Sequence, residues 1–133
     1  FVGKKTFKNP SFTDWVYFSS KNKKKVKLFD NMFTSTLDVS SCAKYIIKLA
    51  LSNSRGIYNL GSKNQISKKD FALKFVEKLD LTLKYDSVTS NIYKVKRGNN
   101  LGLNIKKIEK KLNENMPTIN KVISNLVKDY KWK

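Results

Sequence analysis

The stretch of residues 54–71, SRGIYNLGSKNQISKKDF, constrains the fold more than any other part of this chain. Gly56 is typical of a residue that ends a helix, and residues 57–60 alternate apolar and polar side chains as a short strand does. The Gly-Ser-Lys-Asn that follows is typical of a turn. Ser67 and Asp70 then form a Ser-x-x-Asp capping pattern ahead of an apolar helical face. This order of strand, turn and capped helix is typical of an enzyme and predicts an α/β fold.

Apolar spacing and capping residues predict the remaining elements. We expect helices that begin near Ser11, at Asp38 or Ser40, at Asn104 and at Thr118, and extended segments at 25–29, 81–85 and 93–96. The second of these helices has a wide apolar stripe formed by Val39, Ala43, Ile46, Ile47, Ala50 and Leu51. Trp15 has the spacing of a core residue. Because there is no repeat and no linker of the Gly/Ser or Pro type, we expect residues 1–133 to form a single domain.

The net charge of +18 raises the alternative of a nucleic-acid-binding module. Arg55 and Arg97 are the only arginines among the 28 basic residues, whereas nucleic-acid readers favour Arg for bidentate contacts. The lysines are also spread over every predicted helix, with one cluster at 21–27. This distribution favours a solvated Lys surface, with non-specific electrostatic binding to nucleic acid as the open alternative.

The chain lacks residues that several kinds of chemistry require. It has no His, which excludes a Ser-His-Asp triad and His-ligated zinc, and the single Cys42 can form neither a thiolate metal site nor an intrachain disulfide. There is no G-x-G-x-x-G and no P-loop, so we expect the chain alone to bind no dinucleotide. No apolar run is long enough to span a bilayer and no signal peptide is evident, so we expect a cytoplasmic protein without membrane contact.

The order of the motifs resembles the carboxyl-terminal half of an extended short-chain dehydrogenase/reductase, in the dTDP-4-dehydrorhamnose reductase-like group of sugar-nucleotide reductases, epimerases and dehydratases. The motifs that carry the resemblance are LFDN at 28–31 with the loop to Leu37, GIYNLGS with its helix start at 56–71, and KRGNNLGL at 96–103. The resemblance implies a small mixed α/β substrate-binding portion of a Rossmann-type reductase, without the dinucleotide-binding half.

This resemblance implies that the chain contributes the wall of a sugar-nucleotide pocket. NAD(P)H and the family's Ser/Thr and Tyr-x-x-x-Lys catalytic set would come from an upstream Rossmann half, so we assign no catalytic or metal-binding residue here and expect the isolated chain to be inactive. Reduction of a 4-keto sugar nucleotide is the expected reaction, with an epimerase or dehydratase reaction as an alternative.

The resemblance places four residues at the substrate. Arg97 matches an Arg near the nucleotide diphosphate, with a surface Arg as the alternative. Asn100 would bind substrate or close a turn, and Phe1 would face the sugar or be a core or terminal residue. The resemblance places Thr36 on the substrate loop, at a position where the family usually has Pro. The alternative is that Thr36 has no binding role and only leads into the helix.

Overall fold

The computed structural model describes residues 2–4, 9–92 and 98–131. The helices in this part of the chain are α1 (Phe12–Lys21), α2 (Val39–Leu51), α3 (Lys68–Glu77), α4 (Lys106–Leu112) and α5 (Ile119–Lys131), with a short 3-10 helix at Ser90–Ile92. The strands are β1 (Val26–Phe29), β2 (Phe33–Thr34), β3 (Ile66–Ser67), β4 (Tyr85–Val88) and β5 (Asn100–Leu101). The predicted mixed α/β class is therefore confirmed.

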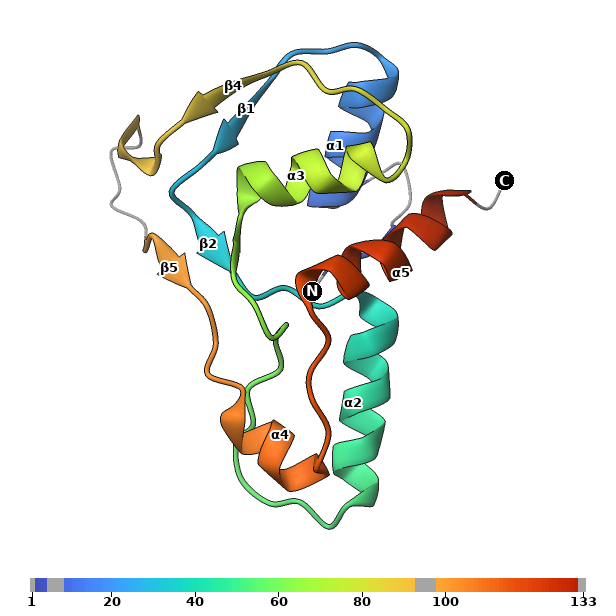
Figure 1. Ribbon diagram of the computed structural model, residues 1–133, viewed down its shortest axis with the longest axis vertical. Coiled ribbons are helices and arrows are strands. Elements are labelled where there is room, and N and C mark those ends of the chain that lie inside the picture. Colours follow the sequence, from blue (N-terminus) through green and yellow to red (C-terminus); the bar gives the residue numbers. More distant parts are fainter. Residues whose placement is uncertain (1, 5–8, 93–97, 132–133) are drawn as a thin grey trace.

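Two small sheets are formed by these strands. β1 pairs with β4 in parallel, with Val26 opposite Tyr85. In the second sheet β2 is central, antiparallel to β3 and parallel to β5. Because β2 directly follows β1 along the chain, the two sheets lie end to end on one side of the molecule (Figure 1). Because β1 and β4 are parallel, the loops that follow these two strands lie at the same end of their sheet.

The hydrophobic core lies where α3 contacts α1, α5 and β1 (Figure 1). Phe75 of α3 is fully buried, and its ring meets that of Tyr130 edge-on with 5.1 Å between centroids. The inner face of α5 is buried along its whole length and consists of Ile119, Val122, Ile123, Leu126, Val127 and Tyr130. The helix predicted to begin at Thr118 is thus confirmed, and its apolar face is part of the core.

Side-chain caps fix the starts of α1 and α3 as the sequence predicted. Ser11 and Asp14 form a complete capping box, in which the Ser11 side chain accepts from the backbone of Asp14. Ser67 Oγ accepts from the backbone N–H of Asp70 at 3.0 Å. Trp15 departs from the prediction of a core position: its side chain lies at the rim, 36% exposed, because only one edge of α1 faces α3.

Two predicted strands are shifted or missing. Residues 57–60 are not a strand, since no neighbouring strand in the described part of the chain pairs with them. The extended segment predicted at 81–85 is displaced toward the carboxyl terminus, to β4, because pairing with β1 sets its register. The segment predicted at 93–96 lies outside the described residues.

Helix α2 exposes its apolar side. Its predicted stripe, which we call the outer face of α2, consists of Val39, Ala43, Ile46, Ile47, Ala50 and Leu51, and all six residues are exposed. Ile46, Ile47 and Leu51 are 51%, 58% and 83% exposed. The helix is capped at Asp38, whose Oδ1 accepts from the Ser41 backbone at 2.9 Å. The sequence therefore predicted this helix and its stripe, but the stripe does not face the core formed by this chain.

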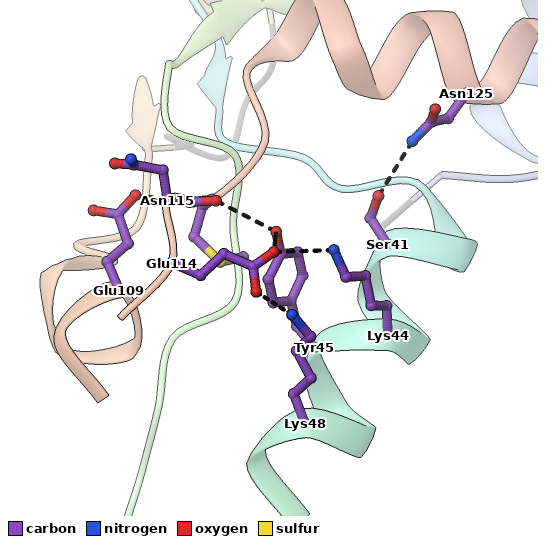
Figure 2. A network of polar contacts seen from close by, with 9 residues as sticks. Ser41, Lys44, Tyr45, Lys48, Glu109, Glu114, Asn115 and Asn125 are labelled. Carbon is purple, nitrogen blue, oxygen red and sulfur yellow. Dashed lines mark hydrogen bonds and ion pairs between the residues drawn. The ribbon is translucent and has the colours of Figure 1, made fainter. Parts of the chain in front are cut away.

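The opposite side of α2 is held by polar contacts with the segment that leads into α5 (Figure 2). Lys44 Nζ lies 3.0 Å from Glu114 Oε1, and Lys48 forms an ion pair with the other carboxylate oxygen. The Tyr45 hydroxyl also donates to Glu114, at 3.3 Å. The bonds from Lys48 and Lys44 lower the pKa of Glu114 from its usual 4.5 to about 2.

Replacing Glu114 by Gln is expected to lower the free energy of unfolding at pH 7 by about 0.5–1 kcal/mol, because partly exposed ion pairs contribute little. The folded-state pKa of Glu114 is depressed, so its contribution is present above pH 4.5 and is lost as the pH falls toward about 2. Urea denaturation from pH 7 to pH 2.5 measures this. Asp86→Asn, which removes the more exposed pair with Lys25, is the control. An equal difference between Glu114→Gln and wild type at pH 7 and at pH 2.5 would contradict the assignment.

Candidate functional site

A small cavity lies between the end of β2 and the start of α3. Its volume is about 130 Å³, and the described residues that line it are Val2, Phe12, Thr34, Thr36, Lys68 and Phe71. The hydroxyls of Thr34 and Thr36 are 3.0 Å apart and form one hydrogen-bonded pair. Phe12 and Phe71 provide aromatic walls, with 6.3 Å between their ring centroids. The cavity lining thus combines aromatic rings with two threonines and one lysine.

Gly61 allows the loop after β2 to take its position. A Cβ at Gly61 would lie 2.7 Å from Ser35 Oγ and 2.9 Å from the Ser35 carbonyl oxygen, so no larger residue fits there without movement of backbone. The Ser35 carbonyl accepts from Ser62 N at 3.2 Å, and its hydroxyl accepts from Leu103 N at 2.9 Å. Ser35 therefore joins the glycine turn to the segment after β5, and it fixes Thr34 and Thr36 on either side of it.

Two of the four predicted substrate residues lie in the described part of the chain. Thr36 lines the cavity. Asn100 lies in β5 opposite Phe33 of β2, is exposed, and accepts from Gly102 N at 2.9 Å through its side-chain oxygen. Phe1 and Arg97 lie outside the described residues. The binding roles of all four stay predictions.

Hydrogen bonds connect the loop after β1 to the loop after β4. Asn31 Oδ1 accepts from Ser90 N at 2.9 Å, and Ser90 Oγ donates to Asn99 Oδ1 at 3.1 Å. The carboxylate of Asp30 accepts from Ser87 Oγ at 2.6 Å. Through Asn99, these contacts hold in place the chain that leads into Asn100.

Lys68 and Thr34 are cavity residues that the sequence reasoning did not single out. Lys68 is the first residue of α3, directly after the Ser67 cap, so its position follows from the predicted helix start. Thr34 has a weaker signal, the alternation of Phe33, Thr34, Ser35 and Thr36 just before the predicted second helix. The cavity's polar groups can donate hydrogen bonds to hydroxyl, carbonyl or phosphate oxygens. None of the lining residues in the described part of the chain is a carboxylate.

A wider and more polar groove of about 400 Å³ lies between α3 and the start of α5. It is lined by Asn64, Gln65, Ile66, Asp70, Lys74, Thr118, Ile119 and Asn120, and it contains none of the predicted substrate residues. In the described residues no group of His, Cys, Asp and Glu could hold a metal ion. No helix in the same part of the chain is both long and apolar enough to span a membrane.

Tyr17 and Lys21 have the Tyr-x-x-x-Lys spacing of the family's catalytic pair, within α1. The structure gives them a packing role. The Tyr17 ring lies 5.4 Å from the Phe18 ring and 5.1 Å from the Tyr130 ring, centroid to centroid, and Lys21 Nζ is 5.9 Å from the Tyr17 ring centroid. Neither residue lines the cavity, so the spacing alone does not identify an active site here.

The mixed α/β fold matches a part of larger Rossmann-type reductase chains. The chain superposes on dTDP-4-dehydrorhamnose reductase from Bacillus anthracis, solved with NADP, at a TM-score of 0.84 and 15% identity, covering 94% of this chain and 44% of that one. A hypothetical dTDP-4-dehydrorhamnose reductase from Sulfolobus tokodaii is similar, with a TM-score of 0.70 and 26% identity, over 83% of this chain and 40% of that one.

Related enzymes share the same fold. The dTDP-glucose 4,6-dehydratase from Bacillus anthracis, solved with NAD, has a TM-score of 0.71 at 16% identity, with 91% of this chain and 39% of that chain covered. No protein-family model and no curated protein matches the chain. The resemblance to extended short-chain reductases is thus confirmed in the fold. The chain spans less than half the length of these solved proteins.

Proposed function

We propose that this chain is the substrate-binding domain of an NAD(P)-dependent sugar-nucleotide reductase that acts on a 4-keto sugar. The observation that carries the proposal is the TM-score of 0.84 to a dTDP-4-dehydrorhamnose reductase, together with a cavity at the predicted Thr36 loop. A dehydratase shares the fold, so an epimerase or dehydratase reaction is the alternative within the same class. The protein would act in the cytoplasm.

The chain's own residues fit a sugar better than a dinucleotide. Its glycines, Gly3, Gly56, Gly61, Gly98 and Gly102, form no G-x-G-x-x-G turn between a strand and a helix. We therefore assign NAD(P)H, which would supply the hydride, to a dinucleotide-binding part outside these residues. The hydroxyls of Thr34 and Thr36 and the ammonium of Lys68 would bind and orient the sugar, and Asn100 and Arg97 would bind the nucleotide side. Phe1 would contact the sugar ring.

Lys68→Ala is expected to raise the dissociation constant for a dTDP-sugar about 5- to 30-fold, because a charged donor to a ligand oxygen contributes about 1–2 kcal/mol. Titration of dTDP-rhamnose into the isotope-labelled chain, followed by NMR, measures this and is expected to shift the signals of Thr34, Thr36 and Lys68. Lys74→Ala, in the wider groove, is the matched control and is expected to leave the constant unchanged.

Two outcomes would count against the proposal. One is saturable NADPH binding by this chain at micromolar concentration. The other is binding to random duplex DNA that persists above physiological salt with a steep salt dependence, which would favour the nucleic-acid-binding alternative suggested by the net charge of +18.

A further inference from the structure

The wider groove between α3 and the start of α5 is built by segments that hydrogen bonds hold together. The backbone N–H of Lys63 donates to the Pro117 carbonyl at 2.9 Å, and Lys63 Nζ lies 3.2 Å from Asn115 Oδ1. These bonds join the turn before β3 to the segment that leads into α5. Ile66 and Ile119 line the groove as buried residues and give it an apolar floor. Its volume of about 400 Å³ lies within the size range of small-molecule sites.

A second hollow of about 280 Å³ extends the groove along α3. It is lined by Lys74, Glu77, Lys78 and Asn120. The first and last of these residues also line the wider groove, so the two hollows adjoin. At about 100° per residue, Asp70, Lys74 and Glu77 fall within an arc of about 60°, whereas Lys68 and Phe71 of the small cavity point about 120° away from them. The groove is therefore elongated and lies on another face of α3 than the cavity.

The walls of the groove carry side-chain amides that are available to a ligand. Asn64, Gln65 and Asn120 are exposed, and in the described part of the chain their amides form no hydrogen bond with another residue. Asp70 uses one carboxylate oxygen to accept from the Ser67 hydroxyl at 2.7 Å. An amide both donates and accepts hydrogen bonds, and the hydroxyl of a sugar does the same. The polar groups of the groove thus match a ligand with several hydroxyls.

The charge that lines the groove is balanced, unlike that of the whole chain. Two lysines, Lys74 and Lys78, and two carboxylates, Asp70 and Glu77, line the two hollows. The chain as a whole has 28 basic and 10 acidic residues. An anion in the groove would be attracted by the lysines and repelled by the carboxylates, so this part of the surface does not favour a phosphate. A neutral ligand meets no such opposition.

A carbohydrate has each of the properties that the groove selects. Its hydroxyls exchange hydrogen bonds with amides, and the C–H groups of its rings cover apolar residues and remove them from water. We propose that the groove binds a neutral oligosaccharide through the amides of Asn64, Gln65 and Asn120, with its rings over Ile66 and Ile119. The groove contains none of the residues of the small cavity, so this inference does not rest on the proposed function.

The test is a titration of the isotope-labelled chain with cellobiose, maltose and lactose in turn, followed by NMR. At least one sugar is expected to give saturable shifts at 64–66, 70–78 and 118–120, with a dissociation constant of about 1–10 mM, because water competes for exposed amides. Asn64→Ala/Asn120→Ala is expected to raise this constant at least about 5-fold through the loss of two hydrogen bonds. The matched control Asn22→Ala/Asn91→Ala, two exposed asparagines outside the groove, is expected to change it less than about 2-fold.

Both double variants are expected to fold, because the exposed amides that they remove bond to no described residue, and their melting temperatures verify this. Absence of saturable shifts with all three sugars would overturn the inference. Equal weakening by the two double variants would also overturn it, as would inorganic phosphate that binds in the groove more tightly than every sugar. Binding of a dTDP-sugar is scored separately at Lys68, so failure of one proposal is distinguishable from failure of the other.

Discussion

Replacement of Phe75 by Ala is expected to lower the free energy of unfolding by about 3–5 kcal/mol, the usual range for a buried Phe. The side chain is fully buried in α3, and α3 contacts α1, α5 and β1. Truncation removes the edge-on contact with Tyr130 and leaves a cavity. The cavity stays open because α1, α5 and β1 are packed against α3 and cannot all move into it. Because a domain of this size is stable by about 5–15 kcal/mol in total, this loss is at least about a fifth of the whole free energy of unfolding.

Urea denaturation followed by far-UV circular dichroism measures this loss, and Phe75→Leu is expected to give an intermediate value since it keeps most of the volume. Leu101→Ala is the control, as that side chain is 55% exposed and its loss is expected to cost less than about 0.5 kcal/mol. Equal stability of Phe75→Ala and Leu101→Ala would show that the core is centred elsewhere.

The features that the sequence predicted correctly are local ones. A capping side chain accepts a hydrogen bond from a backbone N–H only three positions later in the sequence. Ser11, Asp38 and Ser67 therefore identify three helix starts without knowledge of the fold. The apolar face of α5 was also predictable, since a 3.6-residue period is visible in one segment.

The features that the sequence predicted less well depend on distant partners. The strand-like pattern at 57–60 requires a neighbour to pair with, and the described part of the chain has none beside it. The stripe of α2 was correctly located, but periodicity does not say which polypeptide covers it. In both cases the pattern lies within one segment, whereas its partner is set by the tertiary structure.

The candidate site was predictable only in part. Thr36 was placed by the order of motifs, and the structure puts it in the cavity. Lys68 and Thr34 come to Thr36 through the pairing of β2 with β3, which a single sequence does not reveal. The close approach of Ser35 explains why glycine stands at position 61, in the stretch that constrained the fold most. That stretch therefore supports the cavity through Gly61 and supplies Lys68 to its wall.

Replacement of Tyr130 by Phe is expected to lower the free energy of unfolding by about 1.5–3 kcal/mol, as for a hydrogen bond to a charged group. The Tyr130 hydroxyl donates to Asp14 Oδ1 at 2.7 Å and lies 2.9 Å from Thr13 Oγ1. Asp14 is only 2% exposed, so its carboxylate loses a buried donor that water cannot replace. The bond joins the first turn of α1 to the last turns of α5, across more than a hundred residues of sequence.

A pH titration separates this bond from simple packing. Burial raises the pKa of Tyr130 above its ordinary value of 10, so the hydroxyl's contribution is present below pH 10 and is lost as the pH rises beyond it. Stability of the wild type is therefore expected to fall more steeply between pH 9 and pH 11 than that of Tyr130→Phe. Tyr85→Phe, at a 40% exposed position, is the control and should follow the wild-type curve. In a double-mutant cycle with Asp14→Asn, a coupling energy near zero would show that the hydroxyl acts only by filling space, because a bond to the carboxylate requires the two losses to be non-additive.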